Sequence, residues 1–328
     1  MKIILAPERK CYGAPLIFNP NEGRTIIEPP AAGRGNWAGA PSVLFDAHTS
    51  SFYLYYRVRR PRPVRGGECY IAESKNGINF HPIWRLTKED LNSPSLERAC
   101  LTKTLDDKWL LYISYVDPED NRWRIDVIEA ASPSAFDVSK RQKVFTAADV
   151  GTQGVKDPWV MLVNGLYYML VSYAVDLSSL SEEERARMHA TADIYNTGLT
   201  LSSTALAVSG DGRHYEWLGE VFAPREGMWD AYAARLGCLI PTPNGWIGYY
   251  DGSASVKENY EERTGLVHSW DLRNFYRLSQ NGPILVSPHG SGSLRYVDAV
   301  VFDDEIHFYY EYCRPDGSHE LRLSQMRW

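Results

Sequence analysis

A short pattern that recurs five times along the chain constrains its fold more than any other feature of the sequence. Each copy is a run of apolar residues closed by a serine, often followed by Gly or Asp and then by an aromatic residue. Successive closing serines lie 58, 77, 60 and 55 residues apart. They are Ser74, Ser132, Ser209, Ser269 and Ser324. A regular period of this kind indicates a fold built from repeated units.

A strand rich in tyrosine is expected before each copy of the pattern. Tyr accounts for 21 of the 328 residues, against 10 Trp and 10 Phe. The expected strands cover residues 52–56, 109–115, 166–173, 245–250 and 306–312. Turn-forming pairs such as Asn164-Gly165 and Asp303-Asp304 come before these strands, and such pairs between β-prone runs are typical of hairpins.

Five units of short antiparallel strands, each of roughly 60 residues, predict an all-β fold, a five-bladed β-propeller. We expect residues 1–328 to form it as a single domain. A β-sandwich would account for the strands but not for their regular spacing. The last closing serine lies near the C-terminus, so the chain is expected to end inside the fifth blade. Residues Ala14 to Phe18 are then expected to supply that blade's outer strand and to close the ring.

One segment interrupts the period. Residues 178–192 include Ser181 and Glu184, which have the spacing of a capping box at the start of a helix. The sequence therefore predicts a short helix inserted in blade three, and this insertion explains the long spacing of 77 residues. An insertion on the rim of a propeller can be a lid or a plain surface excursion.

Composition and charge exclude several classes of function. The 35 basic and 41 acidic residues leave a net charge of −6, which argues against nucleic-acid or membrane partners. The apolar run at the N-terminus is too short for a signal peptide, and no stretch approaches a membrane span. The five cysteines are odd in number and scattered, which predicts reduced thiols in a cytoplasmic protein and no zinc site. They are Cys11, Cys69, Cys100, Cys238 and Cys313.

The residues that open the inner strands are the candidates for chemistry, because these strands surround the axis of a propeller. Aligning Asp157-Pro158 with Ala40-Pro41 is expected to put Glu97 and Asp298 at the same height. Asp230 is expected on a loop that leads into blade four. Carboxylates held close together in a partly dry site acquire different pKa values, as acid/base catalysis requires. The alternative is that these groups are salt-bridged residues at strand starts.

We therefore predict an acid/base set and a surrounding binding set. The predicted catalytic residues are Glu97, Asp157 and Asp230. The predicted substrate-binding residues are Trp37, Arg57, Arg98, Lys156, Trp229, Arg235 and Asp298. Between Arg57 and Arg65 there are five arginines, which could bind an anionic substrate or phosphate, or simply form a solvated loop.

Several short motifs resemble the five-bladed glycosidase superfamily, which includes glycoside hydrolase families 43, 32 and 130. The motifs are Ala40-Pro41, Lys156-Asp157-Pro158, Trp229-Asp230 and residues 245–252, with Tyr56-Arg57 and residues 71–80 most similar to family 130. The resemblance implies an active site in the axial funnel and a small oligosaccharide or glycoside as substrate. It also implies hydrolysis by carboxylates, with Glu97 in the acid or tuning role and Asp157 in the other. Where family 43 has its base, this chain has Ala40.

Two alternatives remain open beside the hydrolase. Many family 130 enzymes are phosphorylases, in which inorganic phosphate is a co-substrate, and Arg57, Arg98 and Lys156 could hold it. Such an enzyme is expected to have a fuller Glu-Asp-Pro-Arg motif, whereas this chain has only Glu97-Arg98. The second alternative is a propeller that binds carbohydrate without catalysis. We expect no metal and no other cofactor, and the sequence leaves the oligomeric state open.

Overall fold

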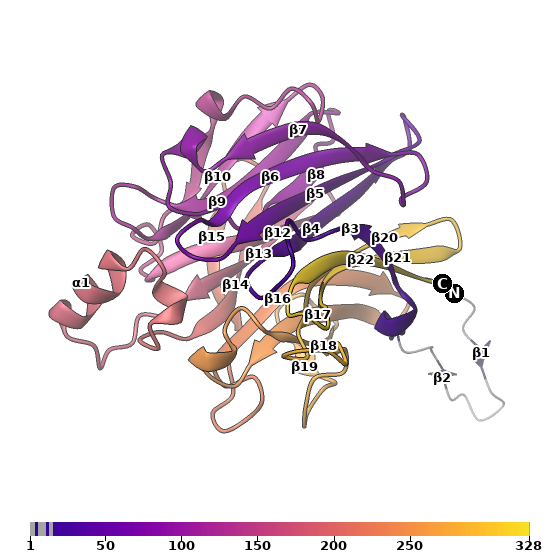
Figure 1. The fold of residues 1–328 in the computed structure, drawn as a ribbon. Coiled ribbons are helices and arrows are strands. Elements are labelled where there is room, and N and C mark those ends of the chain that lie inside the picture. The colour runs from indigo at the N-terminus through magenta and orange to yellow at the C-terminus, as the bar shows by residue number, and fades with distance from the viewer. Residues whose placement is uncertain (1–3, 6–10, 13–15, 328) are drawn as a thin grey trace.

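The computed structural model describes residues 4–5, 11–12 and 16–327, and Figure 1 shows how their strands are arranged. From β3 onward, antiparallel pairing arranges the strands in five groups of four, which we call blades I to V, and single parallel bridges join blades III, IV, V and I into one 16-stranded sheet. The predicted all-β class is confirmed, and the strand pairing follows the predicted division into five units.

Each blade consists of strands that are consecutive in the chain, except for the last one. Blade I contains β4 (Trp37–Asp46), β5 (Ser51–Arg60), β6 (Arg65–Ser74) and β7 (His81–Thr87). Blade II contains β8 (Cys100–Lys103), β9 (Trp109–Val116), β10 (Trp123–Ala130) and β11 (Gln142–Phe145). Blade III contains β12 (Gly154–Val163), β13 (Leu166–Ala174), β14 (Ser202–Ser209) and β15 (Glu216–Phe222). Blade IV contains β16 (Ala233–Thr242), β17 (Gly245–Ser253), β18 (Arg263–Ser269) and β19 (Tyr276–Arg277). Blade V contains β20 (Leu294–Phe302), β21 (Glu305–Cys313), β22 (His319–Arg327) and β3 (Arg24–Ile27).

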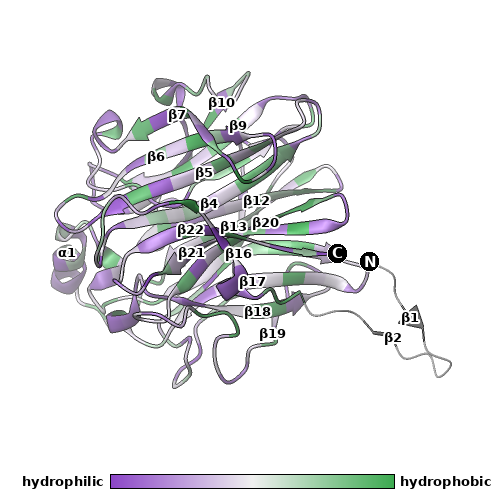
Figure 2. Cartoon of the chain, turned by 45° about the vertical axis from the view of Figure 1, so that its right-hand side comes forward, coloured by the Kyte–Doolittle hydropathy of each residue, from purple (hydrophilic) through white to green (hydrophobic). Residues whose placement is uncertain are grey.

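The expected tyrosine-rich strands are the second strands of the blades, namely β5, β9, β13, β17 and β21. They are mostly apolar because each blade is covered on both faces, and all eight residues of β9 are buried. The predicted hairpin at Asn164-Gly165 joins β12 to β13, and both residues have positive φ, of 51° and 81°. Such angles match the twist of the paired strands. Figure 2 shows apolar residues along the strands and polar residues in the loops.

Blade V is closed by a segment near the N-terminus, but not by the one that the sequence predicted. Its outer strand is β3, which pairs with β22 through Ile27 and Leu321. Of the expected strand Ala14 to Phe18, residues 14 and 15 lie outside the described residues. Phe18 instead packs in the core, with its ring 4.6 Å from that of Phe308. The short helix η1 (Pro20–Glu22) separates this core segment from the strand. The sequence reasoning identified the terminus that closes the ring but placed the strand too early in the chain.

The predicted helix in blade III is present as α1 (Glu182–Ala190), between β13 and β14. Ser181 and Glu184 form the predicted capping box. The helix is mostly hydrophilic and lies at one edge of the molecule. The segment that follows it turns inward and buries Tyr195 in the short helix η4 (Ile194–Asn196). The insertion therefore carries residues toward the axis as well as over the surface.

Three further short helices connect strands, and two more strands form a separate pair. The helices are η2 (Glu89–Leu91), η3 (Val138–Lys140) and η5 (Val256–Glu258). The separate pair consists of β1 (Ile4–Leu5) and β2 (Cys11–Tyr12). Within the described ranges, no helix is both long enough and apolar enough to cross a membrane.

A bulge shifts the register of the inner strand in four of the five blades. These bulges determine which side chains of different blades lie at the same height along the axis. In three of these bulges one residue has positive φ: Ala40 at 53°, Asp157 at 52° and Tyr296 at 54°. The alignment of Asp157 with Ala40 is thus confirmed, and Tyr296 is their counterpart in blade V. Asp298 does not share this level, because it lies two residues beyond Tyr296. A bulge of this kind re-aims side chains locally.

Candidate functional site

A pocket of about 460 Å³ opens where loops from several blades meet. It is bordered by the end of β5, the segment before β4, helix η4 and the loop that contains η5. The lining residues are Arg34, Gly35, Trp37, Arg59, Arg60, Pro61, Arg62, Asn196, Val256, Lys257, Asn259, Tyr260 and Glu261. The pocket combines aromatic surface with several cations, a combination that suits polar or anionic ligands with an apolar face.

Three stacked side chains close the floor of this pocket. The Arg59 guanidinium lies 4.5 Å from the ring centre of Tyr260 and 5.0 Å from that of Trp37. The hydroxyl of Tyr260 donates to Asp193, which follows α1 in the inserted segment. Tyr260 has a φ of 71°, an uncommon backbone conformation for an aromatic residue. The floor is therefore a layer held from blade I, blade III and the η5 loop.

Two of the predicted catalytic carboxylates meet beneath this floor. The hydroxyl of Tyr296 lies 3.4 Å from Oε2 of Glu97 and 3.4 Å from Oδ2 of Asp157. The two carboxylates come from blades II and III, so residues 60 positions apart in the chain converge on one group. Both are buried, with 1% and 4% of their surface exposed. The prediction that Glu97 and Asp157 lie together at the axis agrees with this geometry.

Cations surround both carboxylates. Arg57 forms an ion pair with Glu97, and Arg59 lies 3.5 Å from the other oxygen of Glu97. The ammonium of Lys156 lies 3.1 Å from Oδ2 of Asp157. Oδ1 of Asp157 is buried and has no hydrogen-bond partner among the described residues. This oxygen is therefore available to a ligand that reaches the cluster.

The electrostatic surroundings give very different pKa values to two buried carboxyl groups that contact the backbone and the hydroxyl of Tyr296. Burial alone would raise the pKa of Glu97, but Arg57, Lys156 and Arg59 outweigh it and lower that pKa to about 2. Burial and the nearby Glu262 raise the pKa of Asp251 to about 7. Asp251 accepts a hydrogen bond from the backbone N–H of Tyr296, 3.0 Å away.

Sequence reasoning missed Asp251 as a site residue. Its only signal was its position at the end of a tyrosine-rich strand, where β17 pairs it with Arg235 of β16. Its high pKa depends on the proximity of Glu262, which comes from the loop before β18, and the sequence does not show that proximity.

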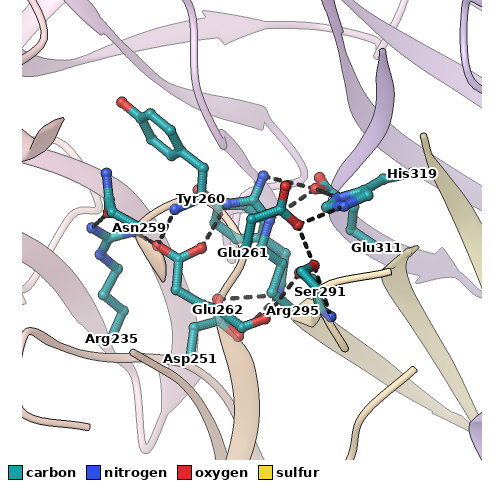
Figure 3. A network of polar contacts seen from close by, with 12 residues as sticks. Arg235, Asp251, Asn259, Tyr260, Glu261, Glu262, Ser291, Arg295, Glu311 and His319 are labelled. Atoms are coloured by element: carbon teal, nitrogen blue, oxygen red, sulfur yellow. Dashed lines mark hydrogen bonds and ion pairs between the residues drawn. The ribbon is translucent and has the colours of Figure 1, made fainter. Parts of the chain in front are cut away.

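A chain of ion pairs continues from the two carboxylates across blades IV and V (Figure 3). Arg235 and Arg295 each lie 2.7 Å from Glu262, and Arg295 also lies 2.7 Å from Glu311. Glu311 in turn pairs with Arg57 at 3.2 Å. The prediction that Arg235, Arg57 and Lys156 lie near the axis agrees with this arrangement. Sequence reasoning did not select Glu262, Arg295, Tyr296 or Glu311.

A glycine in blade I makes room for this network. A Cβ atom on Gly39 would lie 2.1 Å from Oε2 of Glu311. Gly39 pairs with Arg57 in the sheet, so the Glu311 carboxylate reaches Arg57 over the bare backbone of β4.

Deeper along the axis, two further predicted residues serve the fold. Arg98 donates to the carbonyl oxygens of Pro41 and Gly237, at 3.0 and 2.9 Å. Asp298 accepts from Trp159 at 2.9 Å and from the N–H of Val43 at 2.8 Å. Burial raises the pKa of Asp298. These contacts tie several blades together and leave neither side chain open to the pocket.

The structure does not bring Asp230 to the axial cluster. Its carboxylate is buried between Arg225 at 3.0 Å and Arg277 at 2.7 Å, and it accepts from Tyr250. Its neighbour Trp229 packs against Tyr250 and donates to the carbonyl of Ser279. The loop before β16 folds back onto the outer part of blade IV because two arginines neutralise this carboxylate there. The predicted catalytic role of Asp230 and the binding role of Trp229 therefore lack the expected geometry.

The remaining predicted residues fall into two groups. Trp37 lies at the pocket floor, stacked on His319 with 4.7 Å between ring centres. Of the five arginines in the run from Arg57 to Arg65, Arg59, Arg60 and Arg62 line the pocket. Arg57, Arg59 and Arg65 are buried in ion pairs. The run as a whole is therefore neither an anion-binding site nor a solvated loop, the two interpretations that the sequence left open.

Comparison with known proteins relates the fold to carbohydrate-active enzymes. No protein-family profile and no curated protein sequence matches the chain. The solved β-1,2-mannobiose phosphorylase from Listeria innocua is similar with a TM-score of 0.61 and 17% identity, over 92% of this chain and 94% of that one. A structure from work on mannoside phosphorylases and hydrolases of the GH130 family gives 0.62 and 15%, over 98% and 96%. The GH43_1 enzyme from Xanthomonas citri gives 0.61 and 10%, over 92% and 90%. At such identities the likeness establishes the fold, and it agrees with the resemblance seen in the sequence.

Proposed function

We infer that this chain is an enzyme that acts on glycosyl bonds, and that it hydrolyses small oligosaccharides or glycosides. The observation that carries this inference is the pair of buried carboxylates, Glu97 and Asp157, on one tyrosine hydroxyl beneath the pocket. Oε2 of Glu97 and Oδ2 of Asp157 each lie 3.4 Å from the Tyr296 hydroxyl, so the distance between these two oxygens is at most twice that value. This range reaches the separations used by both retaining and inverting glycosidases.

The electrostatics support distinct roles for the carboxyl groups. Glu97, whose pKa is about 2, stays ionised at neutral pH and can act as a base or stabilise positive charge on the sugar. Asp251, whose pKa is about 7, can hold a proton near neutrality, and it lies at the backbone N–H of Tyr296, whose hydroxyl contacts Glu97 and Asp157. One buried oxygen of Asp157 has no hydrogen-bond partner among the described residues and can accept from a substrate hydroxyl or a water.

Substrate reaches these groups through the pocket floor in this proposal. Trp37 and Tyr260 offer aromatic faces, which suit the apolar face of a sugar ring. Since Arg59 and Tyr260 cover Glu97, a bound sugar must displace the Tyr260 side chain to contact the carboxylates. The Tyr260 side chain is the part that would move, because ion pairs of Glu261 and Glu262 hold the backbone that follows it.

A glycoside phosphorylase is the second candidate, and one observation favours it. The pocket wall has exposed or partly exposed cations at Arg34, Arg60, Arg62 and Lys257, which could hold phosphate. The cations predicted for this role, Arg57, Arg98 and Lys156, are instead committed to protein partners. A binding protein without turnover is the third candidate, and the cytoplasmic location stays a prediction.

The test is a screen of aryl glycosides and oligosaccharides with and without inorganic phosphate. We expect turnover without phosphate, and at least a 100-fold loss of kcat in E97Q and in D157N, in line with acid/base contributions of roughly 10²–10⁴. E183Q, a carboxylate-to-amide change on the exposed face of α1, is the matched control and should retain activity. Sugar 1-phosphate formed only with phosphate would favour the phosphorylase. Binding without turnover, or turnover unchanged in both variants, would contradict the acid/base assignment.

A further inference from the structure

A mixed set of metal-binding side chains lies beside the axial network, between the η5 loop and blade V. Glu261, Cys313 and His319 are all buried, and their ligand atoms lie within 4.8 Å of one another. They come from the loop before β18, the end of β21 and the start of β22. A zinc ion with bonds of roughly 2.0–2.3 Å needs only a slightly tighter cluster than this.

The histidine is already oriented for coordination through one nitrogen. Nδ1 of His319 lies 2.9 Å from Oε1 of Glu311, and Nε2 lies 3.0 Å from Oε2 of Glu261. In the metal-free protein Nδ1 can donate to Glu311 and Nε2 to Glu261, and a bound ion would replace the Nε2 proton while the Nδ1 proton stays on Glu311. A carboxylate behind a histidine is the usual outer partner of a metal-bound imidazole. Glu311 is itself held by Arg295 and Arg57, so this partner is rigid.

The carboxylate ligand has outer partners as well. Ser291 donates to Oε2 of Glu261, and Arg34 lies 3.4 Å from Oε1. Arg34 is largely exposed, so it can stay on Oε1 while Oε2 turns toward a metal ion. Each of the two ligands that need orienting is thus supported by a second side chain.

A cavity of about 320 Å³ gives the cluster access and room for a further ligand. It is lined by Arg34, Glu261, Gly290, Ser291, Cys313 and Gly317. Gly290 passes so close to Cys313 that a Cβ atom there would lie 2.7 Å from the sulfur, so a glycine keeps the thiol open to the cavity. A water or a ligand group in the cavity can complete a tetrahedral shell.

We propose that Glu261, Cys313 and His319 bind a zinc-class divalent ion, with the fourth position open to this cavity. A thiolate, an imidazole and a carboxylate match the ligand preference of zinc rather than that of calcium or magnesium. A thiolate and a carboxylate also balance the two positive charges of the ion, so the buried site is neutral overall. Neither the sequence motifs nor the proposed glycosidase chemistry accounts for this cluster.

The bound ion would hold the η5 loop against blade V. Glu261 follows Tyr260, the residue that covers the axial carboxylates, and Glu262 pairs with Arg235 and Arg295 in the network. Coordination of Glu261 therefore joins the cover of the proposed active site to the C-terminal strands. This role is structural and does not depend on hydrolysis or phosphorolysis.

The test is metal titration of the full chain after removal of bound metal by a chelator. We expect one equivalent of Zn²⁺ to bind, and Co²⁺ in its place to give the near-ultraviolet thiolate charge-transfer band and the visible bands of a tetrahedral site. C313S should abolish the charge-transfer band and lower Zn²⁺ affinity at least tenfold. C69S, which changes a buried cysteine on β6 away from the cluster, should leave both unchanged.

Two results would overturn the proposal. One is a parent protein that binds neither ion stoichiometrically. The other is a thiolate band that persists in C313S. The parent spectrum decides the matter even where a variant folds poorly, and E261Q provides a second check because it should weaken Zn²⁺ binding while keeping the charge-transfer band. Both readouts are independent of glycoside turnover, so failure of the proposed function would leave this test intact.

Discussion

Single residues near the axis show how the same side-chain type acquires different properties in one protein. Glu97 and Asp251 are both buried carboxyl groups that lie close to Tyr296. Glu97 has Arg57, Arg59 and Lys156 as neighbours, whereas Asp251 has the acidic Glu262 as its strongest charged neighbour. The neighbours, and not the degree of burial, therefore decide which group is ionised.

The raised pKa of Asp251 makes a prediction for stability. Its pKa of about 7 lies above the value for the unfolded chain, so the folded state retains this proton between about pH 4 and pH 7. As the pH rises through this window, the parent should lose stability relative to D251N, by at most about 1.4 kcal/mol for each pH unit. The loss should level off above about pH 7, because both states are then deprotonated.

Urea unfolding of the parent and D251N across this pH range measures the difference directly. Asn resembles a protonated carboxyl group, so the two proteins should have similar stability at the acid end. A difference that stays constant across the range would show that Asp251 is ionised in the folded protein throughout.

At the scale of elements, the features that depend on neighbouring residues were predicted correctly. The bulges that position the side chains of the candidate site were not. The capping box at Ser181 and the hairpin at Asn164-Gly165 are present as expected, because both depend on residues a few positions apart. The bulges in the inner strands were not predicted. They turn Asp157 and Tyr296 toward each other and leave Asp298 in a deeper layer.

The capping box makes a prediction for the inserted helix. Ser181 Oγ accepts from the N–H of Glu184 at 3.2 Å, and Glu184 accepts from the N–H of Ser181 at 2.8 Å. S181A removes the first bond, so amide hydrogen exchange in residues 182–190 should become faster. S179A, on an exposed position just before the helix, is the control and should not change it. Equal exchange in S181A and the parent would show that packing around Met188 alone holds the helix.

At the scale of the whole molecule, the last blade is completed by a strand from the other end of the chain. β3 pairs with β22, while Leu16 and Phe18 pack in the core beside β17 and β21. These contacts link residues 16–27 to the last blade, close to the other end of the chain. Removing them should therefore affect the entire fold rather than one edge.

Truncation tests this closure. A chain that starts at residue 29 loses β3 and two buried side chains, each of which contributes about 1.5–3 kcal/mol. We expect a clearly lower midpoint of thermal unfolding and more aggregation, because β22 becomes an open edge. A chain that starts at residue 16 keeps these contacts and should unfold near the parent's midpoint. Equal midpoints for the two truncations would contradict a role for this segment in closing the ring.

Local sequence patterns were enough to predict the all-β class, the five repeated units, the tyrosine-rich second strands and the inserted helix. These follow from alternation, turn chemistry and capping, all of which act between residues close in the chain. The sequence also selected Glu97 and Asp157, through their positions at the starts of inner strands.

Which charged residues meet depends on how the blades and loops pack, and local patterns did not predict it. Asp230 had the right residue type and a plausible position, yet Arg225 of the same loop and Arg277 of β19 take up its carboxylate. Asp251 gains its high pKa from a glutamate on another strand, and the cluster of Glu261, Cys313 and His319 joins three separate segments. Such contacts depend on bulges, loop paths and ring closure, and these are properties of packing between blades that no local pattern encodes.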